Sequence, residues 1–218
     1  MKINPSNLKL FYWIMLLVLV SACSPISGGE NITASIASSA SLPEGFERAA
    51  EGRPLQFPDD FGPHPEYQTE WWYYTGNLKT ESGRQFGYQL TFFRRALVPQ
   101  QAKAERSSSW AADQVYMAHF ALSDIESDEH FSFERFSRGA AGLAGAATGP
   151  YEVWLEDWRV GERDAGIYSL YARQDDIVLD LILKDAKGPI LHGDSGYSQK
   201  GVSPGNASYY YSQTRLIS

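Results

Sequence analysis

Large apolar residues alternate with polar ones along most of the chain after residue 66, with the two-residue period of half-buried β-strands. In the segment 84–95, one face is apolar throughout and consists of Phe86, Tyr88, Leu90 and Phe92. The same period predicts eight strands, at 70–78, 84–95, 114–124, 130–137, 151–160, 166–173, 176–184 and 208–216.

Turn-forming residues separate the predicted strands, as in 80–83 and 161–166, and only 99–112 has a helical pattern. The chain shows no internal repeat and no alternation of strands with helices. Many short strands joined by tight turns favour a sandwich or a closed antiparallel barrel, and eight strands enclose room for one small ligand. We therefore expect an all-β fold.

The first residues have the pattern of an export signal. Lys2 and Lys9 precede eleven uninterrupted apolar residues, a length that suits a signal peptide and is too short for a spanning helix. The small residues before Cys23 resemble the bacterial lipobox, which implies a signal peptide over 1–22 and lipidation of Cys23. Ser24 then implies the outer membrane, facing the periplasm. The alternative is an ordinary cleavable signal in which Cys23 is incidental.

After Cys23 the chain changes character twice. The segment 23–53 is rich in Ser, Ala and Gly and predicts a flexible tether, because it has too few apolar groups to bury. The segment 54–65, here called the strap, holds four prolines and predicts an extended entry into a domain that spans 54–218.

Composition excludes several functions. The net charge is −7 and no basic residues cluster, which argues against a nucleic-acid partner. A single cysteine cannot form an internal disulfide. The four histidines lack zinc-ligand spacing, so we expect no metal. The segment 193–196 (GDSG) lacks the rest of a serine-protease signature, and the glycine-rich segment 139–145 does not match a nucleotide-binding loop.

The segment from Glu70 to Tyr74 has the most unusual local sequence, because four consecutive aromatic residues put large rings on both faces of a strand. One interpretation is core packing, and the other is the wall of a ligand cavity. In such a cavity, desolvation would raise the proton affinity of Glu70 and make it a proton donor or a ligand-orienting group. His119, on an apolar face, is either a core residue or a second polar group of the site.

Several segments together resemble the carotenoid 1,2-hydratase-like family, also described as AttH-like, a lipocalin-like group. In order, they are 57–65 (FPDDFGPHP), 70–78 (EWWYYTGNL), 86–94 (FGYQLTFFR), 118–124 (AHFALSD), 136–145 (FSRGAAGLAG), 193–200 (GDSGYSQK) and 208–215 (SYYYSQTR). The resemblance implies a lipocalin-like (calycin) antiparallel β-barrel, the first of two such domains, and cofactor-independent hydration of a carbon–carbon double bond. Other members are described as exported hydrolases.

The resemblance also implies a second half, with an Asp-His-Glu motif, that does not follow here. We therefore expect an N-terminal part of a longer protein whose second lipocalin-like domain is its partner, the alternative being a domain that stands alone. Hydration requires an acid, cation-stabilising rings and a held water. The candidate acids are Glu70, His119 and Asp124; the candidate ligand-binding walls are Trp71, Trp72, Tyr73, Tyr88 and Phe92.

Three hypotheses follow for the function. The chain is part of a lipid-anchored hydratase- or hydrolase-like protein that acts on an apolar, isoprenoid or lipid-like substrate. Alternatively, it is a lipocalin-like binder or carrier of a hydrophobic ligand without chemistry of its own, or a domain that only stabilises its partner.

Overall fold

The structure, a computed structural model, describes residues 44–102, 108, 110–203 and 205–218. Within these residues the chain forms fourteen strands and two short 3-10 helices, η1 (Asp59–Phe61) and η2 (Gln100–Ala102). The all-β expectation is confirmed. The predicted signal peptide, the lipidation residue Cys23 and most of the predicted tether lie outside the described residues.

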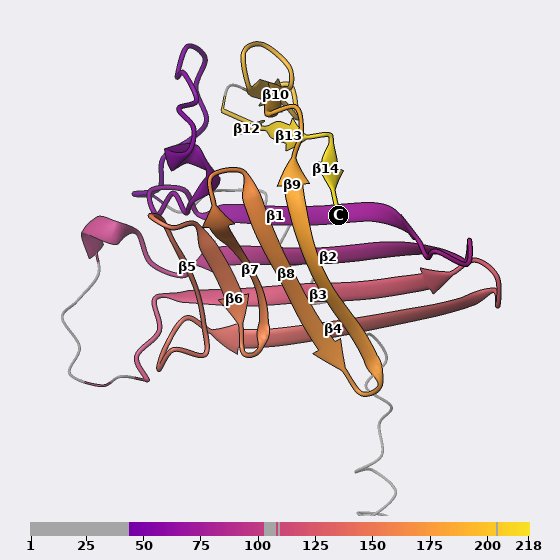
Figure 1. Ribbon diagram of the computed structural model, residues 1–218. Coiled ribbons are helices and arrows are strands. Elements are labelled where there is room, and N and C mark those ends of the chain that lie inside the picture. The colour runs from indigo at the N-terminus through magenta and orange to yellow at the C-terminus, as the bar shows by residue number, and fades with distance from the viewer. Residues whose placement is uncertain (1–43, 103–107, 109, 204) are drawn as a thin grey trace, which may run out of the picture. The chain divides into compact units, whose positions relative to one another are not determined.

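The first sheet is antiparallel and its strand order follows the chain, β1-β2-β3-β4 (Figure 1). Its bounds are close to the predicted ones: β1 (Thr69–Lys79), β2 (Gln85–Ala96), β3 (Gln114–Asp124) and β4 (Glu129–Arg138). The four strands agree with the prediction because each buries one face, so the alternation of the sequence is retained in the fold.

The second sheet has the order β14-β9-β8-β7-β6-β5. Its strands are β5 (Ala144–Ala147), β6 (Glu152–Leu155), β7 (Trp158–Asp164), β8 (Ile167–Gln174), β9 (Ile177–Asp185) and β14 (Leu216–Ile217). The predicted strand 151–160 is divided by a tight turn at Glu156, whose φ is +56°. The glycine-rich segment contributes β5. A glycine is needed at position 145 because the ring of Trp154 fills the space beside it: a Cβ on Gly145 would lie 2.4 Å from Cζ2 of Trp154.

The predicted last strand, 208–216, is also divided. Its residues belong to β12 (Ala207–Tyr209), β13 (Tyr211–Gln213) and the start of β14. Two short strands that the sequence did not predict pair with them: β10 (Pro189–Leu191) with β13, and β11 (Tyr197–Gln199) with β12. Between β9 and β14, the chain therefore forms two small two-stranded sheets, and β14 then returns to the second sheet.

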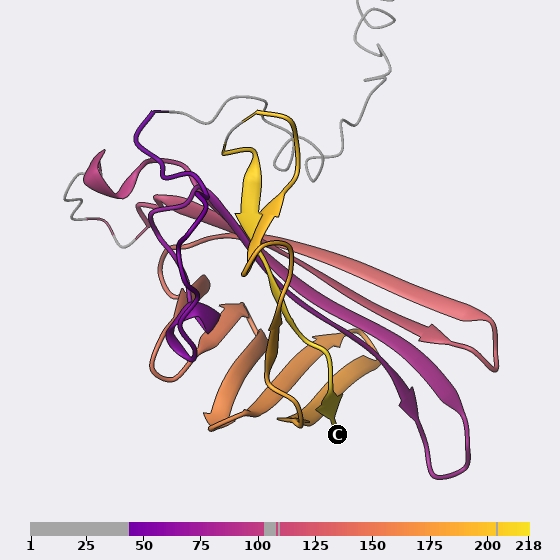
Figure 2. The same cartoon turned by 90° about the horizontal axis from the view of Figure 1, so that it is seen from above.

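The two larger sheets pack through one shared core, and the strands of the second run across the first (Figures 1 and 2). Fully buried residues come from both, including Leu90 and Phe120 of the first sheet and Trp158 and Leu170 of the second. This is consistent with a lipocalin-like fold. In the described residues, however, the sheets are not hydrogen-bonded into the closed barrel that we expected.

The chain contacts this core earlier than the predicted domain start at Pro54. Glu47 forms a β-bridge with Tyr67, and Ala49 is buried. The hydroxyl of Tyr209 bonds both the N–H and the carbonyl of Ala50. The described end of the predicted tether, 44–53, therefore lies against the domain. Among the described residues, no helix has the length and apolarity needed to cross a membrane.

Candidate functional site

The eight site residues predicted from the sequence divide between the two faces of the first sheet, because neighbours along a strand point to opposite sides. The pairing register places Trp71, Tyr73 and His119 on the outer face, where Trp71 and Tyr73 are 40% and 53% exposed. On the inner face, toward the second sheet, lie Glu70, Trp72, Tyr88, Phe92 and Asp124. The predicted aromatic walls are thus on two different surfaces.

The inner face carries a continuous apolar strip that runs from the core toward the β1–β2 turn. Trp72 and Phe92 are buried at its inner end. Farther out, Tyr88 pairs across the sheet with Leu122, which pairs in turn with Phe131. Leu122 and Phe131 are only half-buried. The strip therefore passes from a packed interior to a partly open apolar surface.

Gly76 shapes this strip. A Cβ there would lie 2.8 Å from Cε1 of Tyr88, so the Tyr88 ring occupies the space that a side chain would take. The ring can lie over this position because the cross-strand partner of Tyr88 is Gly76, which has no side chain. The sequence could have indicated this contact only if the register of β1 and β2 had been known.

Two phenols face each other in the interior between the sheets. The Tyr74 and Tyr151 hydroxyl oxygens are 2.8 Å apart and share a hydrogen bond. Burial raises the pKa of both hydroxyls well above the usual value, so both remain neutral. Tyr74 lies on the inner face of β1 between Trp72 and Gly76, so this pair of hydroxyls places polar atoms beside the strip.

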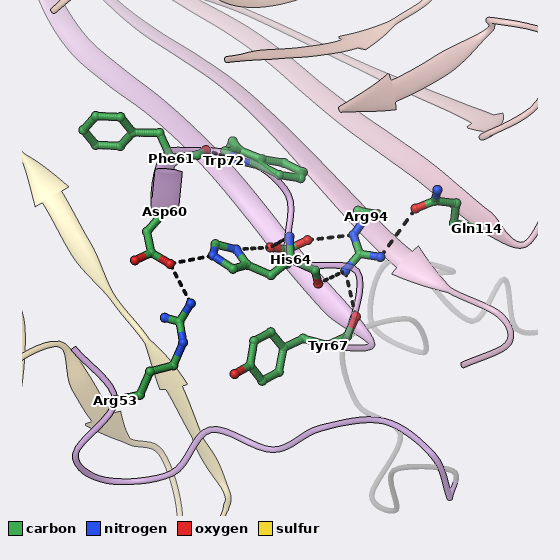
Figure 3. A network of polar contacts seen from close by, with 9 residues as sticks. Arg53, Asp60, Phe61, His64, Tyr67, Trp72, Arg94 and Gln114 are labelled. Carbon is green, nitrogen blue, oxygen red and sulfur yellow. Dashed lines mark hydrogen bonds and ion pairs between the residues drawn. The ribbon is translucent and has the colours of Figure 1, made fainter. Parts of the chain in front are cut away.

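Glu70 lies at the start of β1 and belongs to a network of charged groups. Figure 3 labels its partners His64 and Arg94. Its Oε1 accepts the His64 backbone N–H at 2.7 Å and lies 2.8 Å from His64 Nδ1, while its Oε2 accepts Arg94 Nε at 2.8 Å. The nearest groups to this carboxylate are therefore donors and not aromatic rings.

His64 lies between two carboxylates. Its Nε2 is 2.7 Å from Oδ1 of Asp60, and its Nδ1 faces Glu70. Burial disfavours a charged imidazole, but the hydrogen bonds and charges of Glu70 and Asp60 outweigh it and raise the His64 pKa. Burial also opposes ionisation of Asp60, whose pKa is nevertheless lowered by hydrogen bonds from Gln56 N–H, Arg53 and His64.

Arg94 connects this network to the backbone of the strap. Its side chain is 2% exposed, and its Nη2 donates to the carbonyls of His64 at 2.9 Å and Tyr67 at 2.7 Å. Neither Arg94 nor His64 was predicted from the sequence as a site residue. The sequence does contain a sign of Arg94: it continues the apolar face of its strand at the two-residue spacing. A charged side chain on a buried face needs a buried partner of opposite charge.

The other two predicted acids lie elsewhere. Asp124 pairs with Arg84 at the far end of the sheet, and His119 Nε2 is 2.9 Å from Glu134 on the outer face. The cross-strand partners of Glu70 and Asp124 are eight residues apart on β2, about 26 Å at about 3.3 Å per residue. The three candidate acids are therefore not brought together, and their catalytic role stays a prediction.

Hydrogen bonds from Arg84 and Ser127 hold the pKa of the Asp124 carboxyl well below its usual range. The same carboxylate accepts the backbone N–H groups of Glu126 and Ser127 in the β3–β4 turn. These contacts make Asp124 an ionised group that fixes a turn. Across the described part of the chain, no cluster of three His, Cys, Asp or Glu residues is arranged to hold a metal ion.

Comparison with known proteins relates this chain to a protein family and to a solved structure. A family model described as AttH-like matches residues 48–218. The solved structure of a candidate AttH protein from Nitrosomonas europaea is 37% identical, with a TM-score of 0.68 over 78% of this chain and 50% of that one. This chain therefore spans about half the length of that relative. Among curated proteins, none matches significantly.

Proposed function

This chain belongs to the AttH-like family, and from that premise we propose that it binds an apolar small molecule, of the lipid or isoprenoid kind, between its two sheets. The observation that carries the proposal is the apolar strip, which is buried at Phe92 and half-buried at Leu122 and Phe131. A surface of this kind contributes binding free energy in proportion to the apolar area that a ligand covers.

The two interior phenols add polar atoms to the buried part of the strip, because Tyr74 lies on its face between Trp72 and Gly76. A long apolar ligand on the strip would direct one end toward Tyr74 and Tyr151, whose neutral hydroxyls can donate or accept a hydrogen bond. Pockets for apolar ligands commonly combine apolar walls with a few such polar groups. A carboxyl, hydroxyl or carbonyl group at the end of the ligand fits these donors.

We propose ligand binding in preference to hydration or hydrolysis because neither inner-face carboxyl group, Glu70 or Asp124, is placed to act as an acid on the strip. Protonation of a double bond requires an acid beside the ligand. Asp124 lies at the outer end of the strip and is held as an ionised carboxylate by Arg84. Glu70 lies beyond the inner end, bonded to His64 and Arg94. Neither arrangement presents a proton to the strip.

We also propose the cellular setting. Lipidation at Cys23 and export to the outer membrane would hold the domain on a tether near the bilayer, where apolar ligands concentrate. Multiple acyl chains anchor a protein stably, whereas one chain anchors it weakly. A second lipocalin-like domain is the proposed partner, in line with the greater length of the Nitrosomonas europaea relative.

The test is titration with cis-parinaric acid, a polyene fatty acid, followed by quenching of tryptophan fluorescence. The wild-type chain should show saturable quenching. Phe131→Gln, on the strip, should weaken binding about tenfold, because a half-buried ring contributes roughly 1–2 kcal/mol. Ser132→Gln, the next residue on the opposite face, is the matched control and should bind normally. Quenching that does not saturate in the wild type would refute the proposed function.

A further inference from the structure

The strap closes one end of the interior with two aromatic rings. The Phe57 ring lies 4.8 Å from that of Tyr211, and the Phe61 ring lies 6.3 Å from that of Tyr168, centroid to centroid. The indole N–H of Trp72 donates to the Phe61 carbonyl at 3.1 Å. The strap therefore occupies apolar space beside Trp72, at the inner end of the strip.

Charged groups hold the strap in this place. Within it, Asp60 and His64 bond to each other, and they are the two points at which it meets the network. Arg53 bonds Asp60 from the preceding residues at 2.7 Å, and Glu70 of β1 and Arg94 of β2 bond His64. The charged links from the strap to β1 and β2 therefore pass through His64, and the bond from Trp72 to the Phe61 carbonyl is a neutral link beside them (Figure 3).

Both ring nitrogens of His64 point at carboxylate oxygens, which only accept hydrogen bonds. A neutral imidazole has one N–H and one lone pair, so one of the two contacts would become repulsive. The imidazolium ion donates to both carboxylates. The observed geometry is therefore the geometry of a protonated histidine.

We propose that the strap is a pH-dependent latch: protonated His64 keeps it closed, and loss of that proton withdraws Phe57 and Phe61 from between the sheets. The closed strap covers the inner end of the apolar strip beside Trp72, and the open strap uncovers it. This inference rests on the proposed function for its biological meaning, but the movement of the strap is measurable without any ligand.

The neighbours of His64 whose pKa is shifted do not titrate between pH 6 and 9. Burial opposes the charge of Arg53, but its hydrogen bond to Asp60 raises its pKa, so it stays charged. Desolvation by burial raises the pKa of the Tyr67 hydroxyl far above the range and that of Tyr116 to about 12. The Asp60 carboxyl has a lowered pKa. A change in the strap over this range therefore reports on His64.

The sign of the effect follows from linkage. The pKa of His64 is higher in the closed state than its ordinary value of about 6.5, so the stabilisation of the closed state is complete below that value. As the pH rises from about 6.5 to the closed-state pKa, the opening equilibrium constant should increase about tenfold per pH unit and then level off. High pH opens the strap.

The experiment is hydrogen–deuterium exchange of the 218-residue chain, read by mass spectrometry between pH 6 and 9 and corrected for the intrinsic exchange rate. The amides of Asp60, Phe61 and His64 are hydrogen-bonded in the closed strap and should lose protection with rising pH. Peptides from β8 should not. His64→Gln should give an unprotected strap at every pH, and His130→Gln, an exposed histidine, should behave as the wild type.

A second variant covers the case in which His64→Gln fails to fold. Asp60→Asn removes one of the two carboxylates that face His64, which lowers the pKa of His64 in the closed state. The opening equilibrium constant should then level off at a lower pH than in the wild type. Protection that is constant from pH 6 to 9, or an Asp60→Asn profile that coincides with the wild type, would overturn the latch. Titration with cis-parinaric acid at pH 9, where the strap is open, separates the two proposals: pH-dependent exchange without saturable quenching at pH 9 supports the latch and refutes only the proposed ligand.

Discussion

Replacing Glu70 by Gln tests whether the charged network holds the fold together. Gln has nearly the shape of Glu, but one oxygen becomes an amide nitrogen that donates and cannot accept. Either Arg94 Nε or His64 then faces another donor. Arg94 is 2% exposed and cannot turn to water without leaving the interior. The variant therefore leaves a buried positive charge without its counter-ion.

The size of the loss follows from this burial. Removing one partner of a buried ion pair costs about 3–5 kcal/mol. The Glu70 side chain is 13% exposed, and the Arg94 guanidinium keeps its bonds to two carbonyls, which places the loss near the lower limit. With a slope of about 2 kcal/mol per molar urea, a loss of about 3 kcal/mol lowers the unfolding midpoint by about 1.5 M.

Urea unfolding followed by tryptophan fluorescence measures this change, and Glu156→Gln is the matched control. Glu156 is about half exposed and pairs with Arg135, so its neutralisation should cost less than about 1 kcal/mol. If Glu70→Gln loses no more stability than Glu156→Gln, the network does not stabilise the fold. A large loss has a further meaning: inactivity of a Glu70 variant would not by itself identify an acid catalyst.

Three more outcomes are expected. Tyr151→Phe leaves the Tyr74 hydroxyl without its partner and should lower the free energy of unfolding by about 1–2 kcal/mol in urea titrations; no loss would contradict the shared hydrogen bond. In Arg84→Gln, NMR titration should show the Asp124 pKa rising toward its ordinary value. Because the wild-type pKa is lowered, the stabilisation is present above about pH 4 and is lost in acid, where the two proteins should converge. Leu90→Ala, at a fully buried site, should cost about 2–5 kcal/mol by thermal unfolding, and a smaller loss would argue against tight packing there.

The strands could be predicted wherever burial differs between the two faces. The segment 114–124 was predicted and observed with the same bounds, because its alternation is regular. The segment 151–160 was read as one strand, since the turn at Glu156 contains no glycine or proline to announce it. A left-handed backbone conformation at a glutamate is set by the pairing of its neighbours and not by its own preference.

The candidate site was harder to predict because it depends on register. Alternation shows that Trp71 and Trp72 face opposite sides, but it cannot show which side is inner until the second sheet is placed. The partner of Glu70 is Arg94, 24 residues away on the next strand. His64 joins them from a segment with no regular strand, so no periodicity pointed to it.

The strand order of the two sheets has a consequence for how the chain folds. In the first sheet every pairing joins consecutive strands, and in the second sheet the same holds from β5 to β9. Apart from the longer connection 97–113 between β2 and β3, each sheet can thus grow by closing short loops, which carries a small entropic penalty per step and favours fast collapse. The contacts between the sheets, and the return of β14 to β9, span much longer loops. We therefore expect the docking of the two locally formed sheets, and not the formation of either one, to limit the rate of folding.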